Sequence, residues 1–376
     1  MSQPKPLAEL SPLAPDPHQP RRMNYGDAVR ILGTWAVVVN HVCDMYLGNS
    51  KIMLNGTWWT INFVDSAMRW AVPAYIMLSG ALLLDPARGD TPQKFYKKRL
   101  ARIGIPLVFW TAFFIWFSFY FLVPKGWVTP QQIWRNLGEG KPYAHLHFIF
   151  RIAGLYAFTP MFRIFLRHAS RAMQIAAVVM CLGLASGDSL LNALNKTEPS
   201  VFMRFVPFIG YYLLGYLLRE AHLSRKSLIF CWLGAAASIA ALAAVTGLLI
   251  VRNDGKFDWY PSVQMAFYDF MSPLRIIMAI CVWLIFVNTF RHPWPKHHGL
   301  RTMISWWAST TLGLYLAHPA LRDILYLHGF DALHPFGNQY TNIWLGIPLV
   351  WLMIYLPSLI FTIVIMRIPY VRRIDG

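Results

Sequence analysis

Residues 27–44 read Asp27-Ala-Val-Arg30-Ile-Leu-Gly-Thr-Trp-Ala-Val-Val-Val-Asn40-His41-Val-Cys-Asp44. Mostly apolar residues separate Arg30 from His41. Their offset is almost three turns of α-helix, so both side chains fall on nearly the same face, about 16 Å apart along the axis. If this helix spans a bilayer, Arg30 lies near one surface and His41 lies beyond the midplane. An ionisable group at that depth is costly, so we interpret it first as functional.

Apolar runs of about 20 residues recur along the whole chain. Of its 376 residues, 56% are hydrophobic and only 14% are charged. The four cysteines lie inside these runs without CxxC spacing, so we expect neither disulfides nor a metal site. We predict an all-α, polytopic membrane protein with about ten transmembrane helices, near residues 28–47, 66–84, 103–123, 145–162, 172–187, 201–218, 227–251, 263–288, 305–327 and 341–366.

The net charge of +17 would indicate a nucleic acid partner in a soluble protein. With the N-terminus inside, however, the cytosolic segments contain about three times as many Lys and Arg residues as the outer loops, which is the positive-inside pattern. We therefore expect membrane lipids as partners, no nucleic acid, and both termini in the cytosol. Residues 1–23 are proline-rich and predict a disordered cytosolic tail. Residues 24–370 would form the transmembrane domain, and residues 371–376 a short cytosolic tail.

His41 is the first candidate for chemistry. Considered alone, it is equally well explained as a structural, hydrogen-bonded histidine. Asp44 follows three residues later and can reach an imidazole nitrogen, which would fix the tautomer and raise the basicity, as a general base requires. Together with Arg30 on the same face, the pair favours a functional role. Arg30 itself stays open between a companion of His41 and an arginine that reaches lipid headgroups or pairs with Asp27.

More ionisable residues fall in the outer halves of the predicted spans. Lipid-facing positions for all of them are implausible, because a buried arginine costs roughly 2.5–3.5 kcal/mol on insertion scales. We predict a polar cavity, open to the outer side, that binds the substrate. Its candidate residues are Arg69, Arg151, His145, His147 and His318, with Arg204 and Arg322 at similar depth. Some of these arginines are alternatively structural, paired for example with Asp65, Asp269 or Asp323. The outer-half arginines also hint at an anionic glycan or lipid carrier.

A basic segment, Lys97-Lys98-Arg99 with Arg102, leads into the third predicted span. Such segments are most often the positive flank of a membrane helix. The alternative is a phosphate site, because several cations at the start of a helix can hold a polyphosphate ligand. The sequence alone favours the flank.

Several of these stretches resemble the type 3 acyltransferase family, polytopic bacterial enzymes that move acyl groups onto cell-envelope sugars. The resemblance covers about residues 24–370. It rests on Asp27-x-x-Arg30 and its spacing to His41, Pro73-Ala-Tyr-Ile-Met-Leu-Ser79-Gly80, Lys98-Arg99-Leu-Ala-Arg102-Ile-Gly-Ile-Pro106, His145-Leu-His147, Tyr212-Leu-Leu-Gly215-Tyr and Leu312-Gly-Leu-Tyr315-Leu-Ala-His318-Pro319. The family usually has a tryptophan where this chain has His147. The chain also lacks the soluble esterase-like domain of many relatives, so we expect it to resemble the stand-alone members.

The resemblance implies an acyl-CoA donor, most often acetyl-CoA, which approaches from the cytosol, and no metal. It implies His41 as the essential catalytic residue, with Arg30 as its companion. Lys98, Arg99, Arg102 and Ser79 would then bind the donor. The acceptor would be a hydroxyl of a cell-envelope polysaccharide or lipid-linked sugar, and the protein would lie in the bacterial inner membrane.

We expect His41 to act as general base on the acceptor hydroxyl, oriented by Asp44, while Tyr315 or a nearby arginine stabilises the oxyanion. A transient acyl-histidine is the competing route. The alternative from another class is a transporter or flippase for an anionic glycolipid, because proline-interrupted spans suit carriers. A regulatory relative that binds acyl-CoA without turnover is a third possibility.

Overall fold

The computed structural model describes residues 24–88, 90–195, 204–257, 262–291, 298–334 and 342–368. These residues form helices and connecting loops, and none of them lies in a β-strand. The predicted all-α fold is therefore confirmed. The two predicted tails, residues 1–23 and 371–376, lie outside the described residues, as does part of the span predicted at 201–218.

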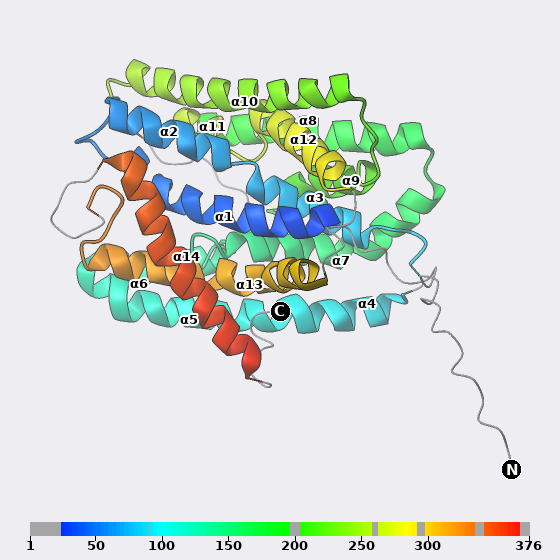
Figure 1. Ribbon diagram of the computed structural model, residues 1–376, viewed down its shortest axis with the longest axis horizontal. Coiled ribbons are helices and arrows are strands. Elements are labelled where there is room, and N and C mark those ends of the chain that lie inside the picture. Colours follow the sequence, from blue (N-terminus) through cyan, green and yellow to red (C-terminus); the bar gives the residue numbers. More distant parts are fainter. Residues whose placement is uncertain are drawn as a thin grey trace, which may run out of the picture.

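Helix α1 (Asn24–Leu47) lies in the middle of the helical bundle, between α2 (Gly56–Met68) and α13 (His298–Leu327) (Figure 1). It also contacts α3 (Ala71–Leu83) and α14 (Ile343–Arg367). Its central valines are buried on several sides, which explains why the run is apolar all round. The end of the bundle at which α1 begins is called the Arg30 end, and the end at which α1 finishes is called the His41 end.

The chain returns from the His41 end through two helices, α2 and α3, which are interrupted at Arg69 and Trp70. The side chain of Asn55 caps the start of α2 by accepting a hydrogen bond from the amide of Trp58. The span predicted near residues 66–84 is therefore wrong at its N-terminal end, because α2 begins at Gly56 and ends at Met68, and α3 begins at Ala71. Across the interruption, Nε of Arg275 from α12 (Pro273–Thr289) donates to the carbonyl oxygen of Arg69 at 2.8 Å, which satisfies a carbonyl that the broken helix leaves exposed.

Helix α3 packs closely against α9 (Ile209–Leu217). A Cβ atom on Gly80 would overlap the backbone oxygen of Tyr212, and a Cβ atom on Gly215 would overlap the backbone oxygen of Met77. Only glycine permits this approach, which is the small-residue packing typical of membrane helices. It holds the second half of the returning segment against the rest of the bundle.

The basic segment belongs to a long helical stretch rather than to a loop. Helix α4 (Pro92–Arg99) continues through a π-helical turn, η1 (Leu100–Gly104), into α5 (Ile105–Phe117). The span predicted from 103 thus has its helical start at Pro92. The turns η2 (Ser118–Leu122) and η3 (Val123–Lys125) follow, and then α6 (Pro130–Gly138), which begins with a capping box between Thr129 and Gln132.

The remaining long helices run between the two ends: α7 (His147–His168), α8 (Arg171–Asn195) and α10 (Arg225–Arg252). The elements η4 (Val206–Phe208) and α11 (Val263–Ala266) are short helical turns. Most helices lie along the long axis of the molecule, whereas α14 crosses them obliquely (Figure 1). Helix α4 lies at the Arg30 end and α6 at the His41 end (Figure 1).

Five helical segments within the described residues are long and apolar enough to cross a membrane: Pro92–Lys125, His147–His168, Arg171–Asn195, Arg225–Arg252 and Ile343–Arg367. The shorter apolar helices Val206–Leu217 and Pro273–Thr289 accompany them. Helices α1 and α13 are as long but carry ionisable residues in their interior faces. The chain is thus a multi-helix membrane protein, while the count of ten spans and the cytosolic termini stay predictions.

Candidate functional site

His41 lies in the second half of α1, inside the bundle. Its Nδ1 is 3.5 Å from Oδ2 of Asp44, and its side chain is 16% exposed. A carboxylate beside Nδ1 favours the tautomer with the proton on that nitrogen and leaves Nε2 to accept a proton. The sequence-predicted pairing of His41 with Asp44 is therefore present in the geometry.

Asp44, in α1, is held in place by an ion pair with Arg69, which lies at the end of α2. Nη2 of Arg69 is 3.1 Å from Oδ1 of Asp44 and 2.5 Å from Oδ2 of Asp65. The amide of Asn40 also donates to Asp65. Because Arg69 and Asp65 are both buried, each charge needs the other. Arg69, a predicted substrate residue, thus makes the structural pair with Asp65 and in addition holds Asp44.

Two further histidines lie beside His41. The ring of His318 from α13 faces it with 5.3 Å between the centroids, and the ring of His145 lies 5.8 Å from that of His318. Nδ1 of His318 lies 2.8 Å from the carbonyl oxygen of Tyr315. Since a carbonyl only accepts, Nδ1 carries the proton and Nε2 has a free lone pair. The structure therefore brings three of the predicted site histidines together.

Unsatisfied nitrogens mark this cluster. Both ring nitrogens of His145, Nε2 of His318 and Nε2 of the neighbouring His147 are buried, and none has a hydrogen-bond partner within the described part of the chain. A buried polar atom without a partner costs about 1–3 kcal/mol. Several such atoms in one cluster indicate a ligand that supplies the missing hydrogen bonds.

Tyr315 and its neighbours complete the wall of the cluster. The hydroxyl of Tyr315 donates to the backbone oxygen of His145 at 2.7 Å, so in this structure it orients the histidine loop and is not aimed at an oxyanion. The hydroxyl of Tyr143 donates to Asp323. Nη2 of Arg322 is 2.6 Å from Oδ1 of Asp323, which is the pair that the sequence left open.

Arg30 lies nearer the other end of α1. Its Nη1 is 3.0 Å from Oδ1 of Asp27, and its side chain is 35% exposed. Its backbone oxygen accepts hydrogen bonds from the hydroxyls of Thr34 and Tyr75 at 2.8 Å each. The pairing of Arg30 with Asp27 is therefore formed, and Tyr75 anchors this turn of α1 to α3.

The residues predicted to bind the donor separate into two groups. Arg99 faces the bundle, with its guanidinium 5.8 Å from the centre of the Tyr156 ring, and the Tyr156 hydroxyl donates to Oγ of Ser79 at 3.4 Å. Nε of Arg99 is buried without a hydrogen-bond partner in the described chain. Arg102 is exposed, and Lys98 is half-exposed and 3.2 Å from Asp90.

A basic hollow of about 370 Å³ lies at the His41 end. The basic hollow is lined by Asn136, Lys141, Ala144, His147, Arg151 and Arg204. Glu139 stands at its edge, 2.9 Å from Lys141 and 3.8 Å from Arg204. Hydrogen bonds from Lys141 and Arg135 lower the pKa of the Glu139 carboxyl, because they stabilise its charged form.

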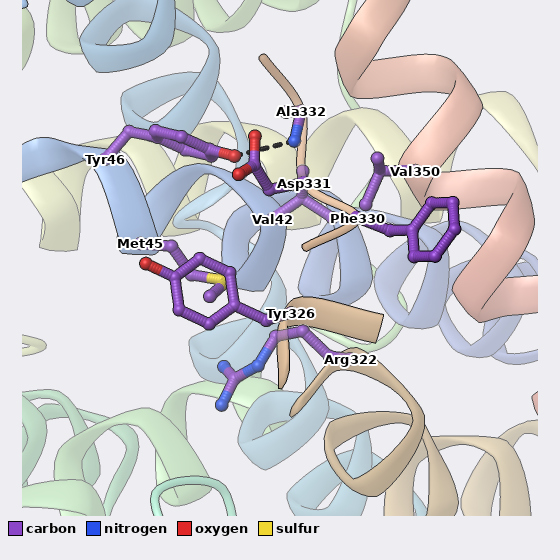
Figure 2. A pocket seen from close by; sticks show the side chains of 9 residues that line it. All are labelled: Val42, Met45, Tyr46, Arg322, Tyr326, Phe330, Asp331, Ala332 and Val350. Atoms are coloured by element: carbon purple, nitrogen blue, oxygen red, sulfur yellow. Dashed lines mark hydrogen bonds between the residues drawn. The ribbon is translucent and has the colours of Figure 1, made fainter. Parts of the chain in front are cut away.

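A second cavity, lined in part by Val42, Met45 and Tyr46 of α1, is too small for a substrate. Its volume is about 10 Å³, which is room for one water. Figure 2 shows its lining, in which the hydroxyl of Tyr46 accepts a hydrogen bond from the amide of Ala332. Arg322 borders it from α13. Within the described residues, no group of three or more His, Cys, Asp or Glu side chains has a geometry suited to a metal ion.

Sequence reasoning missed three parts of this site. Asn136 lies in α6 and Lys141 lies just after it, in a stretch that the sequence assigns to an outer loop. Arg204 was identified from the sequence only as an arginine in the outer half of a predicted span. One signal was available for the ion pairs: Asp65 and Arg69 stand four residues apart, the spacing of helical salt bridges.

A family model described as an acyltransferase domain matches residues 23–367, nearly the whole chain. No curated protein and no solved structure matches the chain.

Proposed function

The chain belongs to the type 3 acyltransferase family and is a membrane acyltransferase, and we propose that it transfers an acetyl group from cytosolic acetyl-CoA to a hydroxyl of a cell-envelope polysaccharide or lipid-linked sugar. In this proposal the protein lies in the bacterial inner membrane with its Arg30 end toward the cytosol. The observation that carries the proposal is His41, paired with Asp44 and facing His318 among buried nitrogens that lack partners.

His41 is the general base of the proposed reaction. Asp44 holds the proton on Nδ1, so Nε2 removes the proton of the acceptor hydroxyl as its oxygen attacks the thioester carbonyl. The C–S bond then breaks, and the proton passes from the imidazolium to the leaving thiolate. Arg69 keeps Asp44 in place at 3.1 Å and offsets its charge. His318 accepts a hydrogen bond through its Nε2 from a second hydroxyl of the acceptor, because the reacting hydroxyl donates its one proton to His41.

The donor enters from the Arg30 end. Two buried guanidinium nitrogens there, Nε of Arg99 and Nη2 of Arg163, lack hydrogen-bond partners within the described residues, which fits an anionic ligand. Both guanidinium groups lie near the Phe95 ring, at 5.7 and 5.0 Å. Ser79 lies further in. Arg102 and Lys98, on the exposed face, attract the nucleotide, and the long pantetheine arm carries the thioester toward His41. Arg30 borders the same route.

The test is turnover of acetyl-CoA by the purified full-length protein, measured as release of the CoA thiol with and without envelope glycan. His41→Ala and His41→Gln should abolish turnover and leave acetyl-CoA binding intact. His334→Gln is a matched control, because His334 also pairs with an aspartate three residues away, at 3.1 Å from Asp331. Full activity of His41→Ala would refute the proposed role.

Three alternatives can be distinguished experimentally. An acyl-histidine route leaves label from acetyl-CoA on the protein in a single turnover without acceptor, whereas direct transfer leaves none. A glycolipid transporter, or a regulatory protein, would show no turnover. The family match favours the enzyme over the transporter.

A further inference from the structure

The basic hollow has the size and chemistry of a binding site that is separate from the donor route. Its volume of about 370 Å³ falls within the range of small-molecule sites, about 300–1,000 Å³. Its lining includes three permanent cations, Lys141, Arg151 and Arg204, and no carboxylate. The hollow therefore favours an anion.

These cations come from separate segments and are held in place. Arg151 projects from α7, and its guanidinium carbon lies 4.6 Å from the ring centres of both Phe208 and Phe270. Arg204 is 8% exposed and lies 3.8 Å from Glu139. Stacking and burial restrict these long side chains before any ligand arrives, which reduces the entropic cost of binding.

His147 adds a directed polar atom. Its Nδ1 faces the backbone oxygen of Ala144, so that nitrogen carries the proton, and the buried Nε2 has no hydrogen-bond partner in the described chain. With the proton on Nδ1, Nε2 accepts a hydrogen bond from a ligand hydroxyl. The hollow thus offers both cations and a selective polar contact.

One short segment of chain, residues 144–147, contributes both to the basic hollow and to the histidine cluster. Ala144 and His147 line it, and His145 between them turns inward, where its ring lies against that of His318. His318 in turn faces His41. The hollow therefore lies next to the histidine cluster.

We infer that the basic hollow binds an anionic group of the acceptor, a carboxylate or a phosphate of an acidic glycan, and so presents a neighbouring hydroxyl to His41. This inference rests on the proposed function and adds the acceptor's chemical class to it. Arg151 and Arg204 grip the oxyanion, Lys141 contributes at the rim, and His147 contacts the sugar.

The experiment measures binding by isothermal titration to the full-length protein in detergent at low ionic strength. The probes are glucuronate for a carboxylate, glucose 1-phosphate for a phosphate, and glucose as the neutral match. The variants are Arg204→Gln, Arg151→Gln and, as a milder change at the rim, Lys141→Gln. Arg135→Gln is the control, because Arg135 pairs with the same Glu139 at 2.8 Å but is 79% exposed and outside the lining.

We expect at least one anionic probe to bind about tenfold more tightly than glucose. Arg204→Gln and Arg151→Gln should each weaken that binding about tenfold, as for loss of one charged hydrogen bond, and Lys141→Gln should weaken it less. Arg135→Gln should bind as the unmodified protein does. The tighter of the two anions identifies the source of the charge. Acetyl-CoA binding by each variant reports that it is folded.

Three results would overturn the inference: equal binding of glucose and both anions, an equal loss in Arg135→Gln, or competition between acetyl-CoA and glucose 1-phosphate for the hollow, which would make it a donor site. Acetyl-CoA turnover is followed separately. Anion binding without turnover would count against the proposed function alone, and turnover without anion preference would count against this inference alone.

Discussion

The imidazole rings of His41 and His318 face one another across the interface of α1 and α13, with 5.3 Å between their centroids and 33° between their planes. Nδ1 of His318 is committed to the backbone at 2.8 Å, whereas Nδ1 of His41 is directed to Asp44. Each ring therefore has an Nε2 that can accept a hydrogen bond, so the pair can accept one hydroxyl at His41 and a second hydroxyl of the same ligand at His318.

Replacement of His318 tests this arrangement. We expect His318→Ala and His318→Gln to lower kcat/KM for acetyl transfer about 10- to 100-fold, because each loses the hydrogen bond that His318 accepts from a second hydroxyl of the acceptor. The pH–rate profile should keep its shape, since His41 still takes the proton. A merely structural histidine would lower thermal stability without changing kcat/KM of the folded fraction.

Replacement of Asp44 removes the group that orients His41. Asp44→Asn should lower kcat about 100-fold or more, because the amide no longer favours the required tautomer. Acetyl-CoA binding should be retained. Asp331→Asn, which alters the His334 pair, is the control and should leave kcat unchanged. A wild-type kcat in Asp44→Asn would contradict the assigned orientation.

Glu139 gives a pH dependence of stability. Its folded pKa lies below the ordinary value of 4.5, so its contribution is present above pH 4.5 and disappears as the pH falls through the lower folded pKa. The protein should be more stable than Glu139→Gln at pH 7 by less than about 1 kcal/mol, as expected of a partly exposed ion pair. Thermal unfolding measured from pH 7 downward follows the difference, which should shrink as the pH falls below 4.5. An unchanged difference would refute the assignment.

Gly80 tests the packing of α3 on α9. A Cβ at this position meets the backbone oxygen of Tyr212, which cannot move without shifting the helix, so Gly80→Ala should destabilise the protein by about 1–3 kcal/mol. Gly183→Ala in α8 is the matched control, because a Cβ there meets nothing within 4 Å, and alanine favours helix. Equal thermal unfolding temperatures for the two variants would contradict the close approach.

The sequence predicted the parts of this protein that depend on local pattern. Apolar runs identified the helical fold, and the three-residue spacing predicted the approach of Asp44 to His41. The meeting of His41 with His318 could not be predicted, because it depends on which helices become neighbours. The break at Arg69 was missed for a related reason: residues on both sides of it form helix readily, and the interruption is stabilised by Arg275, far along the chain. The π-helical turn after Arg99 could not be predicted either, because its residues have no distinctive composition.

The bond from Arg275 to the backbone of Arg69 also constrains how such proteins can be recombined. Arg275 sets the break between α2 and α3, Arg69 at that break holds Asp44, and Asp44 orients His41. A chimera of two related chains that takes α1 to α3 from one parent and α12 from the other would inherit His41 intact and yet misalign it. Crossover points in such hybrids should keep residues 24–83 and 262–289 from the same parent.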